Sequence, residues 1–70
     1  MNKPFEVSYK FNTGVIFSKE CEFLGNALEN YERLAERKQI KEIIITYLPT
    51  YQIMVKYDRT KQKEYRKWTN

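Results

Sequence analysis

Histidine is absent from this 70-residue chain, and cysteine, proline and glycine are scarce. The single cysteine, Cys21, excludes an internal disulfide, and without histidine no cysteine–histidine zinc site can be built. We therefore expect no metal site and no cofactor. The lack of histidine also removes the side chain that titrates nearest neutrality, so a serine–histidine–aspartate triad cannot be assembled. With only Gly14 and Gly25, the chain has no glycine-rich phosphate loop.

The remaining reactive side chains do not form a catalytic arrangement either. Glu20 and Glu22 are two residues apart and would point in different directions on a helix. Three further glutamates would share one helical face with an arginine, which is typical of a solvated face: Glu29, Glu32, Glu36 and Arg33. A helix N-terminus can lower a thiol pKa, but a partly buried structural cysteine is the favoured interpretation of Cys21. We predict no catalytic residue and no enzymatic activity.

Long apolar runs are also missing. No run exceeds three residues, as in Ile43–Ile45, whereas a membrane span needs roughly 18. The N-terminus leads into alternating residues rather than an apolar signal segment. Together with the lone cysteine, this favours a soluble cytoplasmic protein without membrane insertion. A single domain of this length buries only about 60% of its unfolded surface, so oligomerisation or a partner is the expected further source of stability.

The first half of the chain predicts a hairpin followed by a helix. Residues 4–11 alternate apolar and polar side chains as a half-buried strand does, and after Asn12–Gly14 the segment Val15–Phe17 returns as a short second strand. A helix is predicted over about 19–38, with Ser18 as its N-cap. One apolar stripe runs along it, made of Phe23, Leu24, Ala27, Leu28, Tyr31, Leu34 and Ala35. Phe5, Tyr9 and Phe11 are expected to pack under that stripe.

A second hairpin follows, formed by residues 40–48 and 51–57 around a turn at Pro49–Thr50. The predicted fold is therefore α+β: a small antiparallel sheet of two hairpins with one helix across a face, in the order ββαββ. This body spans residues 1–57.

The strand at residues 40–48 is apolar on both sides, so both of its faces should be covered. One helix can cover only one face. The C-terminal segment, a second copy or a binding partner could cover the other. The candidate residues for such a partner interface are Ile44, Leu48 and Met54.

Residues 58–70 form a basic, aromatic C-terminal segment, either part of the same domain or a mobile tail. A short helix placing Tyr65 and Trp68 on one face is preferred to a strand, although Arg59 and Lys61 would oppose the dipole of its first turn. From residue 56 onwards six basic groups face two acidic ones, so this stretch carries the whole net charge of +4.

Lysines and arginines among aromatic rings suit nucleic acid, because cations neutralise phosphates and rings stack on unpaired bases. The candidate nucleic-acid-binding residues are Lys56, Arg59, Lys61, Lys63, Tyr65, Arg66, Lys67 and Trp68. An acidic protein surface is a second possible partner for them, and a solvated basic end whose aromatics complete the core is the plainer interpretation. Shallow electrostatic attachment to an anionic membrane is the weakest alternative.

The other functional hypothesis is a protein–protein inhibitor or adaptor, acting through the second sheet face or the exposed helix face around Gly25 and Glu29. It could be a homodimer or bind a stoichiometric protein partner. Compact proteins of this size without catalytic groups are common among phage and mobile-element regulators that act on host proteins, an analogy that rests on size and class alone.

Overall fold

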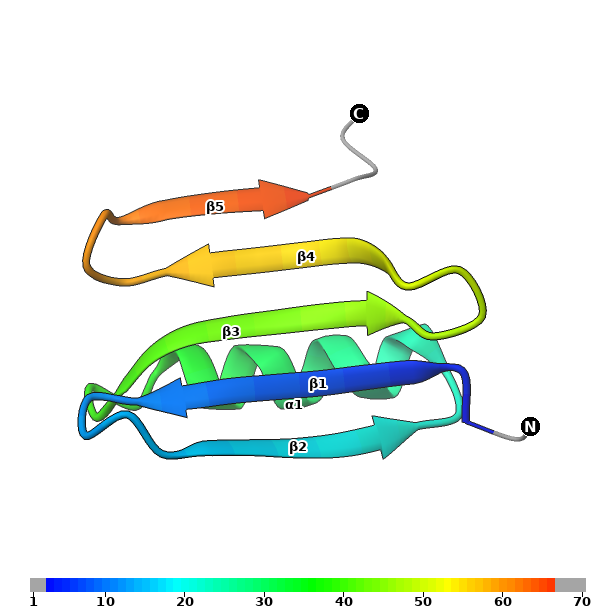
Figure 1. Ribbon diagram of the computed structural model, residues 1–70, viewed down its shortest axis with the longest axis horizontal. Coiled ribbons are helices and arrows are strands. Elements are labelled where there is room, and N and C mark those ends of the chain that lie inside the picture. Colours follow the sequence, from blue (N-terminus) through cyan, green and yellow to red (C-terminus); the bar gives the residue numbers. More distant parts are fainter. Residues whose placement is uncertain (1–2, 67–70) are drawn as a thin grey trace.

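Five antiparallel strands form one sheet, and a single helix packs across one of its faces (Figure 1). The computed structural model describes residues 3–66, in which the spatial strand order is β2-β1-β3-β4-β5. The elements are β1 (Phe5–Phe11), β2 (Ile16–Cys21), α1 (Leu24–Ala35), β3 (Ile40–Tyr47), β4 (Gln52–Asp58) and β5 (Lys63–Arg66). The α+β class and both hairpins are confirmed, and the order is ββαβββ, with one strand more than the ββαββ body.

The core lies between the helix and the three central strands. Val7, Ile45 and Val55 face one another across β1, β3 and β4 and are fully buried. Ala27 and Tyr31 of α1 close over them, and burying each large aliphatic side chain contributes about 1.5–3 kcal/mol. The predicted packing of Phe5, Tyr9 and Phe11 against this core is confirmed, as is that of Leu24, Leu28, Leu34 and Ala35 from the helix stripe. We call this helix-covered side of the sheet the inner face and the opposite side the outer face.

The helix exists where its apolar stripe predicts it, but the predicted start at residue 19 is wrong. Ser18 is not an N-cap, because it pairs with Ser8 in β2, which continues to Cys21. The helix begins after Phe23, which offers no side-chain cap and is 62% exposed. Residues 18–21 remain in β2 because they pair antiparallel with β1, and this pairing buries Cys21 beneath the helix. The strand pairing therefore outweighs the local tendency of Ser18 to start a helix.

The predicted short C-terminal helix is also wrong. Residues 63–66 form β5, which pairs antiparallel with β4 in the register Asp58↔Lys63 to Val55↔Arg66. An Asp58 turn makes this possible: its carboxylate accepts hydrogen bonds from the Thr60 hydroxyl and amide, at 2.6 and 3.0 Å. Gln62 adopts a left-handed φ of 52° at the end of the turn. The segment therefore leaves β4 by a tight reversal instead of continuing as a helix.

The outer face of the sheet is open. Within residues 3–66, no helix or loop lies over it (Figure 1). The expectation that the C-terminal segment covers this face is not met by those residues, because β5 extends the sheet at its edge. Trp68, the other aromatic invoked for that role, lies outside the described residues.

Candidate functional site

The basic residues predicted to bind nucleic acid are divided between the two faces of the sheet. In β5, Arg66 lies opposite Val55 on the inner side, whereas Tyr65 lies opposite Lys56 on the outer side. Lys67 and Trp68 lie outside the described residues. The six described candidates therefore do not form one continuous surface.

Arg59 is engaged within the fold. Its guanidinium donates hydrogen bonds to the backbone carbonyls of Ala35, Arg37 and Ile40, at 2.6, 2.8 and 2.8 Å. It also lies over the Tyr57 ring, 5.4 Å from the centroid. Ala35 is the last residue of α1 and Arg37 follows it closely, so Arg59 caps the helix C-terminus from the β4–β5 turn and also binds the first carbonyl of β3. A phosphate would have to compete with three internal acceptors.

Arg66 is likewise committed to the inner side. It pairs with Glu64 at 3.1 Å and lies over the Tyr31 ring, 5.7 Å from the centroid. The Tyr31 hydroxyl donates a hydrogen bond to the same Glu64 carboxylate. Burial, followed by the hydrogen bond to the Glu64 carboxylate, raises the pKa of Tyr31, and the hydrogen bonds from Arg66 and then Tyr31 lower the pKa of Glu64. This cluster attaches β5 to the helix.

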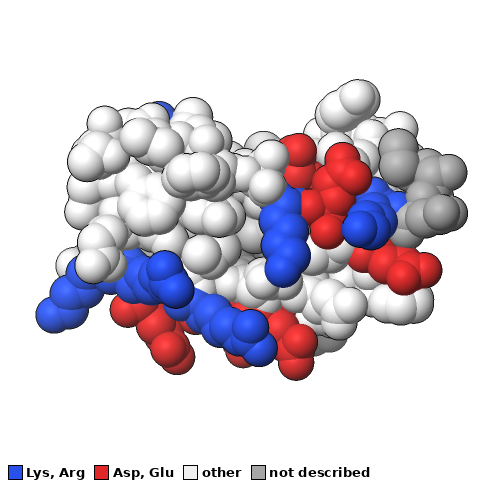
Figure 2. Space-filling view, turned by 90° about the horizontal axis from the view of Figure 1, so that it is seen from below, with Lys and Arg blue, Asp and Glu red and all other residues white. Residues whose placement is uncertain are grey.

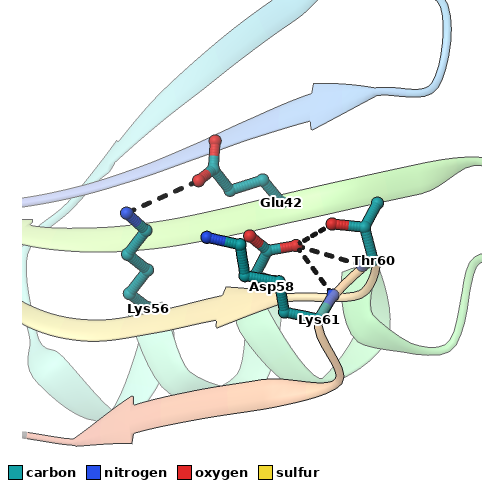
Figure 3. Close-up of polar contacts among 5 residues, drawn as sticks. All are labelled: Glu42, Lys56, Asp58, Thr60 and Lys61. Carbon is teal, nitrogen blue, oxygen red and sulfur yellow. Dashed lines mark hydrogen bonds and ion pairs between the residues drawn. The ribbon is translucent and has the colours of Figure 1, made fainter.

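Four candidates remain together on the outer side of the β4–β5 hairpin. Lys56, Lys61, Lys63 and Tyr65 line one hollow with Asp58 and Glu64, which we call the basic hollow. Tyr65 is 53% exposed. In Figure 3 the Lys56 side chain points toward Glu42 on β3, and its Nζ forms an ion pair with Glu42 Oε2 at 3.6 Å. The Asp58 carboxylate accepts hydrogen bonds from the Thr60 hydroxyl and the Lys61 amide (Figure 3). The hydrogen bond from Thr60 lowers the pKa of Asp58 most, so this carboxylate stays charged inside the hollow.

The three residues predicted as a partner interface are not equivalent. Ile44 is half-buried on the outer face, in a hollow with Ser8, Lys10, Ile16 and Glu42. Leu48 is half-buried at the β3–β4 turn. Met54 packs against the core, at the point where the β3–β4 register shifts between Ile45 and Thr46. This bulge breaks the alternation that placed Met54 beside the other two.

A second hollow at the β3–β4 end of the outer face combines carboxylates with apolar side chains. Its lining residues are Glu6, Glu20, Leu48, Pro49 and Tyr51, and we call it the acidic hollow. Glu6 and Glu20 are direct cross-strand partners, an arrangement of like charges that costs stability. Tyr51 is 79% exposed and has a left-handed φ of 55°. Thr46 and Ile53 continue the row from Glu20 and Glu6 across the sheet, and Ile53 is 39% exposed.

The turn that presents Tyr51 is held from both sides. The Leu48 amide donates to the Pro4 carbonyl at 2.7 Å, which ties the turn to the start of β1. The Tyr51 amide donates to the Leu48 carbonyl at 3.2 Å, which closes the turn itself. The backbone that carries the exposed ring is therefore held close to the start of β1, next to Glu6.

Sequence reasoning missed the acidic hollow. Glu20 was placed on a helix, so its pairing with Glu6 could not be seen. The available signal was the hairpin register: a turn at Asn12–Gly14 places residues whose numbers add up to 26 opposite each other, as Glu6 and Glu20 are. Tyr51 was treated as part of a strand, although it follows a Pro-Thr turn.

Among residues 3–66, no helix is long and apolar enough to cross a membrane. In the same part of the chain, no three histidine, cysteine or acidic side chains are grouped so that they could hold a metal ion. Comparison with protein-family models, with curated proteins and with solved structures finds no match to this chain.

Proposed function

We propose that this chain is a non-enzymatic binding protein that recognises a partner protein through the outer face of its sheet. The observation that carries the proposal is the acidic hollow, where an exposed aromatic ring and Leu48 lie beside two directly opposed carboxylates. Exposed aromatic residues held in fixed positions are typical anchors of protein interfaces. Neither Glu6 nor Glu20 forms an ion pair with a residue in the range 3–66, and two such neighbouring carboxylates favour a cation.

The partner that fits has an apolar side chain flanked by basic ones. Its apolar group would pack on Tyr51 and Leu48, and an arginine or lysine would be placed between Glu6 and Glu20. A guanidinium there relieves the repulsion between the two carboxylates, so binding recovers stability that the free protein lacks.

The test uses two labelled peptides, one alternating arginine with leucine and one alternating glutamate with leucine, measured by fluorescence anisotropy. We expect the arginine peptide alone to bind. Tyr51→Ala, or the double change Glu6→Gln and Glu20→Gln, should weaken binding about tenfold or more, which corresponds to about 1.4 kcal/mol. The matched control changes two glutamates of α1 and its C-cap, Glu32→Gln and Glu36→Gln, and should leave affinity unchanged. Equal binding of both peptides, or indifference to the hollow variants, would contradict the proposal.

Nucleic acid is the second candidate partner, favoured by the basic hollow. Tyr65 exposes its ring beside Lys56 and Lys63, and Lys61 lies in the adjoining turn. Three phosphate contacts on a single strand predict a slope of about −2.1 for log affinity against log salt. Tyr65→Ala should remove a stacking contribution of about 1–3 kcal/mol.

A single-stranded oligonucleotide titrated at several salt concentrations tests this candidate. The double variant Lys61→Gln and Lys63→Gln should bind more weakly, whereas Lys19→Gln on β2, at the opposite edge of the sheet, should not. Affinity independent of salt, or equal losses from Lys19→Gln and the double variant, would exclude the basic hollow as the site.

A further inference from the structure

The two edges of the sheet have opposite character. β5 has only four residues, Lys63–Arg66, three of them charged, which is how edge strands avoid pairing with other chains. β2 begins instead with consecutive exposed apolar side chains. Val15, Ile16 and Phe17 are 49%, 62% and 52% exposed, and we call them the apolar edge segment.

Figure 2 looks at the molecule from the β2 side. A broad uncharged surface occupies the left of this view, on the side of the β1–β2 turn, and the charges gather along the lower margin and the right half.

The apolar edge segment is apolar on both faces of the sheet. Phe17 lies on the inner side. Its ring stacks on that of Tyr9, with 5.9 Å between the ring centroids, and packs edge-to-face against that of Phe11, with 5.7 Å between the centroids. Ile16 lies on the outer side, in the hollow that contains Ile44. A strand with apolar side chains on both faces is typical of the interior of a sheet, where neighbouring strands cover each side. At an edge, half of its backbone N–H and C=O groups are also left without a strand partner.

We propose that two copies of this chain pair antiparallel along β2, joining their five-stranded sheets into one continuous sheet with both helices on the same face. The apolar edge segment and Tyr51 lie at opposite ends of the sheet, but Glu20 belongs both to β2 and to the acidic hollow. The proposal concerns self-association and does not require the proposed function.

Symmetry restricts the register. A two-fold axis perpendicular to the sheet keeps each side chain on its own face, so paired positions must have numbers of equal parity. Centred on Ser18, the pairing places Phe17 opposite the partner's Lys19 and Ile16 opposite the partner's Glu20. No like charges then face each other, the small Ser18 pair can hydrogen-bond on the axis, and each ammonium group can lie over a phenyl ring.

The flank of β2 favours an identical copy over a strongly charged partner. The charged groups that line the hollow between β2 and α1 comprise three bases and three acids, beside the neutral thiol-bearing Cys21: Lys3, Lys19, Arg33, Glu20, Glu22 and Glu29. This balance means that a second copy meets no net repulsion. A dimer also supplies the additional burial that a chain of this length needs in place of disulfides or a metal.

Sedimentation equilibrium of the full chain tests the proposal across about 1 μM to 1 mM, the range that covers weak and moderate dimers. The expected mass is twice the 8.6 kDa of one chain. Ile16→Lys and Phe17→Lys should each give a monomer with an unchanged circular dichroism spectrum, because both side chains are more than half exposed. The matched control Tyr65→Lys, at the opposite edge, should stay dimeric. A monomer at every concentration, or a dimer that survives Phe17→Lys, overturns the proposal.

A cross-link tests the geometry without depending on the folding of the lysine variants. Ser18→Cys places a thiol on the two-fold axis, within reach of its own copy. Mild oxidation should give a disulfide-linked dimer for this variant, but not for Gln62→Cys in the β4–β5 turn. Equal cross-linking of the two variants would overturn the β2 pairing.

Discussion

Arg59 and Lys61 stand two positions apart in the same basic stretch and have different roles. Arg59 binds three backbone carbonyls at the end of α1. Lys61 is exposed and contributes to the fold only through its amide, which donates to Asp58 at 3.4 Å. Charge counting along the sequence treats both as equal contributions to a basic patch. The contacts of Arg59 give it a structural role, whereas the exposed side chain of Lys61 is accessible to a ligand.

This difference predicts unequal effects on stability. Arg59→Ala should lower the free energy of unfolding by about 1.5–3 kcal/mol, because it removes three charge-assisted hydrogen bonds to backbone carbonyls. Lys61→Ala should change it by no more than about 0.5 kcal/mol. Urea unfolding of the two variants beside the unchanged chain measures both values. Similar effects from the two substitutions would show that the Arg59 contacts do not contribute as described.

At the scale of elements, β5 depends on one carboxylate. Glu64 accepts hydrogen bonds from Tyr31 and Arg66, and the contact with Arg66 is the largest cause of its lowered pKa. A carboxylate whose pKa is lowered on folding stabilises the folded state above its ordinary pKa of 4.5 and loses that contribution as the pH falls below it.

Acidification should therefore release β5 before it unfolds the sheet. Between neutral pH and a pH below 4.5, the protection of amides from exchange, relative to the intrinsic rate at each pH, should fall more at residues 63–66 than in β1 or β3. Glu64→Gln should remove this pH dependence, whereas Glu36→Gln should preserve it. An equal loss of protection in all strands, or a Glu64→Gln variant with the original pH dependence, would argue against the Glu64 attachment.

The turn before β5 carries a second testable feature. Gln62 has a φ of 52°, in the left-handed region that costs an ordinary residue roughly 1–2 kcal/mol, and its side chain is exposed. Gln62→Gly removes this cost but adds unfolded-state entropy, so a net gain of about 0.5 kcal/mol in unfolding free energy is expected. Thermal unfolding measures the change. A loss of stability would mean that the Gln62 side chain makes a contact that the turn requires.

The hairpins and the helix were predictable because their signals are local and periodic. The alternation in residues 4–11 and the stripe from Leu24 to Ala35 each follow from the spacing of apolar residues. The strand at residues 63–66 was not predictable in the same way, since its inner side is formed by Glu64 and Arg66, which are polar. Its position depends on Tyr31, a residue 33 positions away in the sequence.

The residues of the candidate site could also be predicted only where local patterns place them. Leu48 and Ile44 were identified from the doubly apolar strand, and both lie on the outer face. Met54 does not lie beside them, because the β3–β4 bulge breaks the alternation on which its prediction rested. Glu6 and Glu20 lie opposite each other only because β2 extends to residue 21, which the sequence pattern did not predict. Long-range register, rather than residue type, decides which side chains meet.

At the scale of the whole molecule, the net charge of +4 does not form a single surface. Arg59 and Arg66 are bound on the inner side, the lysines that remain share their hollow with Asp58 and Glu64, and the opposite end of the outer face is acidic. The helix covers one face of the sheet, and within residues 3–66 the other face is open (Figure 1). This open face, with a different charge at each end, is the surface that we propose for partner binding.

The most direct test is an amide NMR titration of the isotopically labelled chain with the arginine–leucine peptide. Shifts confined to the outer face, strongest around Glu6, Glu20, Leu48 and Tyr51, are the predicted result. Shifts centred on the solvent-exposed side of α1, or no shifts at peptide concentrations up to about 1 mM, where even weak complexes form, would contradict the claim that the open sheet face is the binding surface.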